Sequence, residues 1–154
     1  MITQYVIVKF VHIFIAIVAL GTSAGLGIVL EFYGNHSIHG PFVLRMIHRL
    51  VALVVMPGYV LMLLTGAWLT HLSWSFTTKW IEAALGLWVV GAVFLGLSLT
   101  VLRRQIALLE STGPSSPAYK RMSFLERVLG GGGGLVIVVI LYFMVVKPAG
   151  FLPS

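Results

Sequence analysis

His12 is an ionisable side chain inside an apolar run that extends from Tyr5 to Leu30. A helix needs about 20 mostly apolar residues to span a bilayer, and a titratable group within such a helix is costly enough to indicate a functional site. At 100° per residue, small side chains fall within roughly 60° of His12 on this helix, namely Ala16, Ala19, Ser23 and Gly27. An imidazole above a flat face of small residues is suited to a porphyrin whose iron the histidine binds.

The second iron ligand has two candidates, His71 and His48. His71 follows the second apolar run at its outer end, so it and His12 would bind one iron from two helices if Pro57 tilts the second span. His48 lies near the inner end of the same run. His12 and His71 are therefore the predicted metal ligands, although His71 is also consistent with an unrelated interfacial histidine. The sequence indicates no catalytic residue.

Basic residues near these histidines are candidates for pairing the carboxylates of the porphyrin, and they are Lys9, Arg45, Arg49 and Lys79. Lys9 precedes His12 by about one turn, and its stem can extend toward the membrane surface. The two arginines flank His48 on one face of the second span, where guanidinium groups hold carboxylates well. Ordinary anchoring at the membrane surface is the alternative role for these arginines.

The composition identifies the class of protein. The chain is 59% hydrophobic and 9% charged, whereas soluble domains contain about 25% charged residues. We therefore expect an integral membrane protein. The absence of cysteine excludes disulfides, iron–sulfur clusters and covalently attached c-type haem. The formal charge of +6 marks the ends of apolar runs and forms no basic patch, so we expect no binding of nucleic acid.

Apolar runs long enough to span a membrane cover residues 5–30, 42–70, 78–102 and 128–146. They predict an all-α, integral membrane four-helix bundle that forms a single transmembrane domain over residues 1–154. Pro57 predicts a kink in the second span, and Pro148 ends the fourth. The connection 103–127 includes a turn-rich stretch and is expected to be a loop. Because Glu31 and Glu82 lie at span ends, we expect no carboxylate buried in mid-membrane.

Basic residues also predict the orientation. Seven of the ten Lys and Arg residues lie at one set of span ends, and they are Arg45, Arg49, Arg103, Arg104, Lys120, Arg121 and Arg127. The positive-inside rule places these ends in the cytoplasm and both termini outside. We therefore expect a multi-pass protein of the bacterial inner membrane, surrounded by membrane lipid.

Glycines indicate close packing. Gly21 and Gly25 form a GxxxG pair on the face of the first span opposite His12, and Gly130–Gly134 is a run of five in the fourth. Such residues allow two helix backbones, or a planar ligand and a backbone, to approach closely. We expect a homo-oligomer, most simply a dimer, in which a second subunit covers Gly21 and Gly25. The alternative is that the fourth helix of the same subunit covers them.

Three stretches carry a resemblance to a known family: VKFVHIFIAIVALGTSAGL, RMIHRLVALVVMPGYVLMLLTGAWL and TTKWIEAAL. Together they resemble the haem-dependent bacterial protoporphyrinogen oxidases and, more closely, a related group of predicted integral membrane proteins. The resemblance implies that His12 binds haem, and that Arg49 with Leu50 and Lys79 match the family's Arg-Leu pair and lysine. The family has a second histidine in its third span, where this sequence reads GLSLTVL.

These observations lead to a ranked set of functions. The first is a membrane protein that binds haem b and transfers electrons to a quinone or another redox partner. The second is an enzyme that oxidises porphyrinogen, which the resemblance alone implies. The third is copper handling or small-molecule transport without haem, which the histidines with Met46, Met56 and Met62 suggest.

Overall fold

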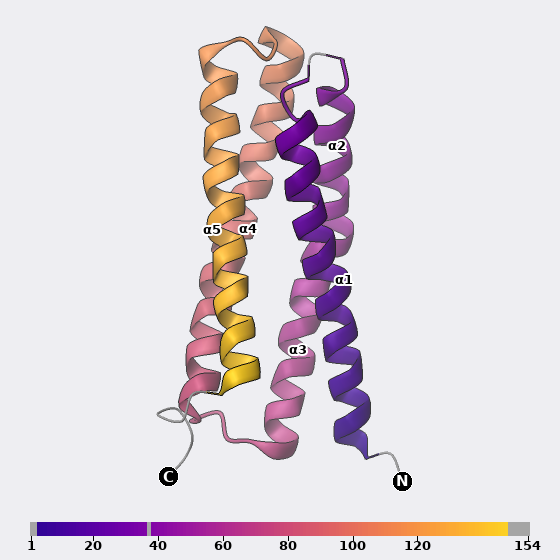
Figure 1. Ribbon diagram of the computed structural model, residues 1–154, viewed down its shortest axis with the longest axis vertical. Coiled ribbons are helices and arrows are strands. Elements are labelled where there is room, and N and C mark those ends of the chain that lie inside the picture. The colour runs from indigo at the N-terminus through magenta and orange to yellow at the C-terminus, as the bar shows by residue number, and fades with distance from the viewer. Residues whose placement is uncertain (1–2, 37, 148–154) are drawn as a thin grey trace.

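The computed structural model describes residues 3–36 and 38–147, and the elements in this part of the chain are all helical. They are α1 (Gln4–Tyr33), α2 (Gly40–Leu50), a π-helical turn η1 (Val51–Val55), α3 (Met56–Ser73), α4 (Lys79–Thr112) and α5 (Pro117–Val146). Because α2, η1 and α3 follow one another without a break, the described chain forms four rods, with the start of α1 and the end of α5 at the same end (Figure 1). Each rod is long and apolar enough to span a membrane. The prediction of an all-α membrane protein with four spans is confirmed.

The four rods form two pairs. α1 packs along α3, and α4 packs along α5, while α2 contacts both α1 and α4 (Figure 1). Small residues bring α1 and α3 together, because a Cβ atom added at Gly58 would lie 2.7 Å from the Cβ of Ala19. The Tyr59 side chain extends from α3 to α4, where a Cβ added at Gly91 would collide with its hydroxyl.

The expected irregularity at Pro57 is the π-helical turn η1, which ends two residues before the proline. Proline donates no backbone hydrogen bond, and its ring crowds the carbonyl one turn earlier. A single wide turn accommodates both effects without ending the helix.

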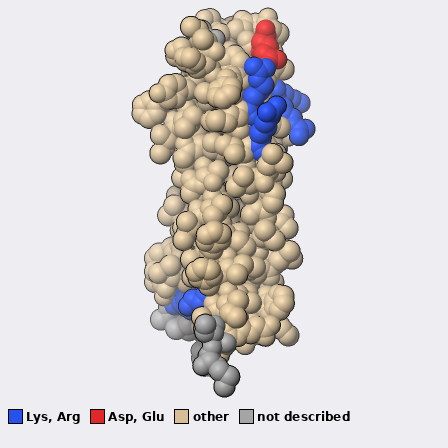
Figure 2. Space-filling view, turned by 90° about the vertical axis from the view of Figure 1, so that its right-hand side faces the viewer, with Lys and Arg blue, Asp and Glu red and all other residues tan. Residues whose placement is uncertain are grey.

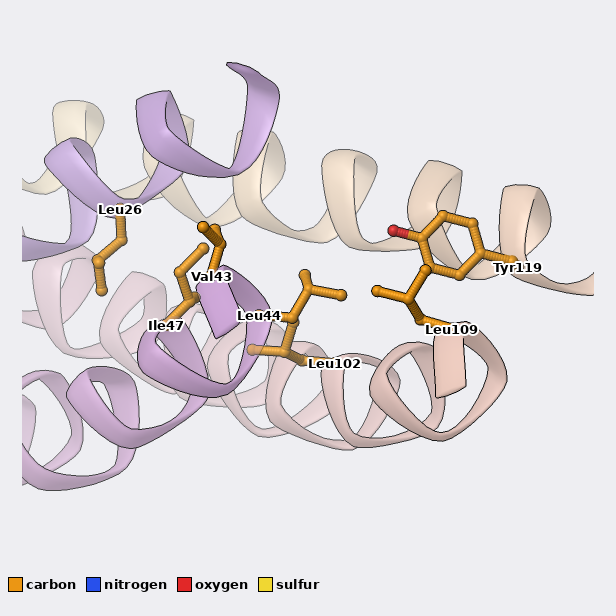
Figure 3. Packing of buried hydrophobic residues seen from close by; sticks show 7 residues of the cluster. All are labelled: Leu26, Val43, Leu44, Ile47, Leu102, Leu109 and Tyr119. Carbon is orange, nitrogen blue, oxygen red and sulfur yellow. The ribbon is translucent and has the colours of Figure 1, made fainter. Parts of the chain in front are cut away.

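A cluster of buried hydrophobic residues lies near the end of the molecule opposite the start of α1, which we call the loop end. Its buried members come from four of the helices and are Leu26, Val43, Leu44, Ile47, Leu102, Leu109 and Tyr119 (Figure 3). Leu44 and Tyr119 have no exposed surface. The loop end is therefore where the two helix pairs are joined most firmly.

The prediction that residues 103–127 form a loop is wrong. α4 continues to Thr112 and α5 begins at Pro117, so only a short turn separates them. Helix continues because Leu109 and Tyr119 are buried in the core, which stabilises the amphipathic ends of both helices. Gly113 ends α4 with a φ of 77°, and the Ser116 side chain caps α5 by accepting a hydrogen bond from the backbone N–H of Tyr119.

Charged residues gather near the loop end, and Figure 2 shows an uncharged band between them and a smaller basic patch toward the termini. Ion pairs at the loop end join Arg45 to Glu110 at 2.6 Å and Arg127 to Glu31 at 2.9 Å. Both pairs connect helices that are far apart in the sequence. They close the surface over the core and leave the middle of the bundle apolar.

Candidate functional site

His12 of α1 reaches across to α3. Its Nδ1 lies 2.7 Å from the hydroxyl oxygen of Thr65, and that hydroxyl donates to the carbonyl of Leu61 at 2.7 Å. A hydroxyl has one proton, so when Thr65 donates to Leu61 its oxygen accepts from His12. In that arrangement Nδ1 of His12 carries the proton, and a two-step hydrogen-bond chain orients the imidazole.

The other ring nitrogen of His12 keeps its lone pair in this arrangement. Nε2 makes no hydrogen bond with any residue in the described part of the chain. The ring is half-buried and lies beside Gly66, where an added Cβ would be 3.3 Å from Cε1 of the imidazole. Glycine at this position lets α3 pass close to the ring. His12 is thus oriented by one nitrogen and has the other available for a ligand.

Packing of α1 against α3 takes up part of the small-residue face beside His12. Ala19 is 1% exposed and packs against Gly58 of α3, as the close approach of the two helices requires. Gly27 is exposed, and a Cβ added there would meet nothing within 4 Å. Ala19 thus serves helix packing, and the binding of a porphyrin to this face stays a prediction.

The structure does not bring the other predicted ligands to His12. His71 is exposed in the last turn of α3, five residues after Gly66, which corresponds to about 8 Å along a helix. The Nε2 of His48 accepts a hydrogen bond from Nε of Arg103 at 2.9 Å, so this histidine contacts α4 at the loop end. Within residues 3–36 and 38–147, no group of three or more His, Cys, Asp or Glu side chains gathers in the manner of a metal site.

The four basic candidates divide between the two ends of the bundle. Arg49 precedes Thr65 by 16 residues, or about 24 Å along the rod, and Arg45 is engaged by Glu110. These arginines lie too far from His12 to share one porphyrin with it. Lys9 is on α1 one turn from His12, whereas Lys79 begins α4 and pairs with Glu82 at 3.1 Å. Lys9 is the basic residue best placed to act with His12.

The five glycines of α5 fall into two groups, those that pack against α4 and those whose Cβ positions face open space. Gly132 and Gly133 lie against Phe94 of α4, where a Cβ at Gly132 would be 2.8 Å from the ring. A Cβ at the other three, Gly130, Gly131 and Gly134, would meet nothing within 4 Å. The same holds for Gly21 and Gly25 of α1. The alternative that these two glycine surfaces cover each other within one subunit is therefore excluded.

Two important side chains were missed in the sequence. Thr65 gave no signal, because only the packing of α1 against α3 makes it a partner of His12. Glu126 lies two residues before the predicted fourth run, yet it is 5% exposed and bonded to Ser98 of α4. It lies inside a helix that is long and apolar enough to span the membrane, so the expectation that no carboxylate is buried there is wrong. The sign available in the sequence was an acidic residue two positions before a run of apolar residues and glycines.

Comparison with known proteins supports the membrane assignment and names no activity. No curated protein and no solved structure matches the chain. Residues 6–148, nearly the whole chain and all four rods, match a family described as predicted integral membrane protein. The chain therefore belongs to the DUF2269 family of predicted integral membrane proteins.

Proposed function

We propose that the protein binds haem b through His12 and transfers electrons within the membrane. One observation carries this proposal: Nδ1 of His12 lies 2.7 Å from the Thr65 hydroxyl, which in turn donates to the Leu61 carbonyl at 2.7 Å. Histidines that bind metals through Nε2 almost always donate their other N–H to such a partner, which fixes the ring and raises its basicity. An intramembrane imidazole prepared in this way is well suited to bind iron.

Each residue of the site has a distinct part in this proposal. His12 would bind the iron, Thr65 would orient the ring, and Lys9 would pair a propionate. Haem, when bound, supplies one-electron redox chemistry. The absence of a second histidine near His12 in the described residues leaves the second ligand to another group. We propose a quinone or another redox protein as partner, and the bacterial inner membrane as location with both termini outside.

An absorption spectrum of the purified protein tests the assignment. We expect a haem band from non-covalently bound haem, and the loss of most of that band in His12→Ala, because the iron loses its protein ligand. His71→Ala is the matched control, since His71 is exposed and contacts neither Thr65 nor Gly66 in the structure. Unchanged haem content in His12→Ala, with normal helicity and yield, would contradict the proposal.

A further inference from the structure

Three of the four acidic side chains in this protein have a basic partner. They are about half exposed and form the ion pairs Glu31–Arg127 at 2.9 Å, Glu82–Lys79 at 3.1 Å and Glu110–Arg45 at 2.6 Å. All three lie near helix ends. Such pairs are the ordinary state of a carboxylate at a protein surface.

Glu126 is the fourth acid, and it differs from the other three in its burial and in its hydrogen-bond partner. It is 5% exposed, and the hydroxyl of Ser98 on α4 donates to its Oε1 at 2.5 Å. Its Oε2 is fully buried and makes no hydrogen bond with any described residue. Arg127, the next residue along α5, binds Glu31 instead. The carboxyl group therefore lies between two helices with a single hydroxyl as its partner.

An ionised carboxylate is unstable in this environment. Burial removes the water that stabilises the charge, and neither a cation nor a set of hydrogen-bond donors replaces it. A neutral carboxylic acid is compatible with the same contacts, because its carbonyl oxygen accepts from Ser98 and its other oxygen carries the proton. The geometry thus favours the protonated form.

A second polar layer lies between Glu126 and the loop end. Gln105 and Tyr119 lie seven residues from Ser98 and Glu126, respectively, so they occupy the same faces of α4 and α5 about 10 Å nearer that end. Gln105 donates to the Tyr119 hydroxyl at 3.2 Å, and Tyr119 donates to the carbonyl of Gly34 at 2.6 Å.

This layer also contains an unused acceptor. The Oε1 atom of Gln105 is buried and has no hydrogen-bond partner among the described residues. Polar groups therefore occupy two levels of the α4–α5 interface, about 10 Å apart, and the buried side chain of Leu102 lies on α4 between them. An acid buried inside a membrane bundle indicates a functional site, and the binding of a proton is the chemistry that a neutral carboxyl group supplies.

We propose that Glu126 is a proton-binding site that exchanges its proton with the loop end along the α4–α5 interface. Ser98 positions the carboxyl group, and Gln105 with Tyr119 is the next polar pair toward the loop end, through which the proton would pass. The site is separate from His12, and the proposal does not depend on haem. It assigns the protein a second chemical capacity, the reversible uptake of a proton inside the bundle.

Dicyclohexylcarbodiimide, an apolar reagent that adds to protonated carboxyl groups, tests whether Glu126 holds a proton. A carboxyl group in water is protonated to only about 0.2% at pH 7, so we expect at least tenfold faster labelling of Glu126 than of the exposed acids. The full-length protein is labelled in its membrane and digested, and the adducts are located by mass spectrometry. Glu126→Gln, which preserves the shape of the side chain, should lose the adduct. Equal labelling of all four acids would overturn the proposal.

Infrared spectroscopy tests whether the proton of Glu126 exchanges with water. We expect a carbonyl band of a protonated carboxyl in the wild type, its absence in Glu126→Gln, and a shift of the band in heavy water. A band that does not shift would show a static buried acid and overturn the proposal. Gln105→Leu should slow the shift several-fold, whereas Ser111→Ala, which removes a hydroxyl bonded only to the backbone of α4, should not. Equal rates in both variants would refute the route.

Sodium provides a further control, because a buried carboxyl group can bind a cation instead of a proton. The labelling rate is compared in sodium and in choline salts at constant pH and ionic strength. We expect no difference. Protection of Glu126 by sodium would identify a cation site and overturn the assignment to a proton.

Discussion

Tyr59 of α3 and Trp88 of α4 exchange hydrogen bonds in the middle of the bundle. The Tyr59 hydroxyl donates to the Trp88 carbonyl at 2.9 Å, and the Trp88 indole donates to the Tyr59 carbonyl at 3.3 Å. Their rings stack with centroids 5.0 Å apart. Gly91 provides the space for the tyrosine hydroxyl. This pair therefore joins the two helix pairs at a level below the core.

Replacement of Tyr59 by phenylalanine removes one of these bonds and leaves the Trp88 carbonyl without its side-chain donor. We expect a loss of about 1 kcal/mol in the free energy of unfolding, measured as a lower midpoint of thermal unfolding in a mild detergent. Tyr142→Phe is the control, because the structure shows no hydrogen bond for the exposed hydroxyl of Tyr142. Equal midpoints for the two variants would show that the Tyr59 bond contributes nothing.

Thr65→Val should weaken haem binding without removing it. Valine preserves the shape of threonine but cannot accept from Nδ1 of His12, and loss of such a partner typically costs 10- to 100-fold in metal affinity. Thr70→Val is matched to it, because Thr70 also bonds a carbonyl one turn earlier but does not touch His12. Haem titration of both variants measures the difference. A similar loss in Thr70→Val would attribute the effect to helix packing.

The orientation can be tested with single cysteines, because the natural chain has none. Ser115 is exposed in the turn between α4 and α5, and Thr3 is exposed at the opposite end. In intact cells we expect an impermeant thiol reagent to label Thr3→Cys and to leave Ser115→Cys unmodified. After the cells are broken, both positions should react. Labelling of Ser115→Cys in intact cells would reverse the orientation.

The dimer expectation depends on the open glycine surface of α1. Leucine at Gly21 and Gly25 meets nothing within 4 Å at the Cβ position inside one subunit, so we expect the fold to persist and the mass in detergent to fall from dimer to monomer. Light scattering measures the mass and circular dichroism the helicity. A wild-type protein that is already monomeric would refute the expectation.

Gly58 provides the opposite test, because its added Cβ would lie 2.7 Å from Ala19. We expect Gly58→Val to destabilise the α1–α3 pair by about 1–3 kcal/mol, the usual cost of overpacking. The same variant should also disturb the contact between His12 and Thr65, which depends on that pair. An unchanged unfolding midpoint would show that α1 and α3 are not closely packed in the membrane.

The sequence predicted the number and type of elements because apolar runs of membrane length have few alternative structures. The sequence did not predict the features that depend on contacts between helices. The amphipathic pattern of Leu109 and Tyr119 was present in the sequence, but only their common core with α2 shows why helix replaces the expected loop.

At the candidate site, too, the sequence did not predict the contacts between helices. His12 was identified from its own position in an apolar run, whereas the packing of Ala19 against Gly58 was not predicted, since a porphyrin and a neighbouring helix favour the same small side chains. Ser98 and Glu126 are 28 residues apart, and no periodicity within either helix indicates their contact. Partners of this kind follow from the register of α4 against α5, which depends on packing.

The apolar surface of the four rods is mostly not covered by the protein itself. In the most apolar window of each rod, only 11%, 17%, 11% and 0% of the residues are buried inside the protein. Most side chains in these windows therefore face the surrounding lipid and not one another. The length of the surrounding lipid chains therefore influences the orientation of the α1–α3 pair relative to the α4–α5 pair.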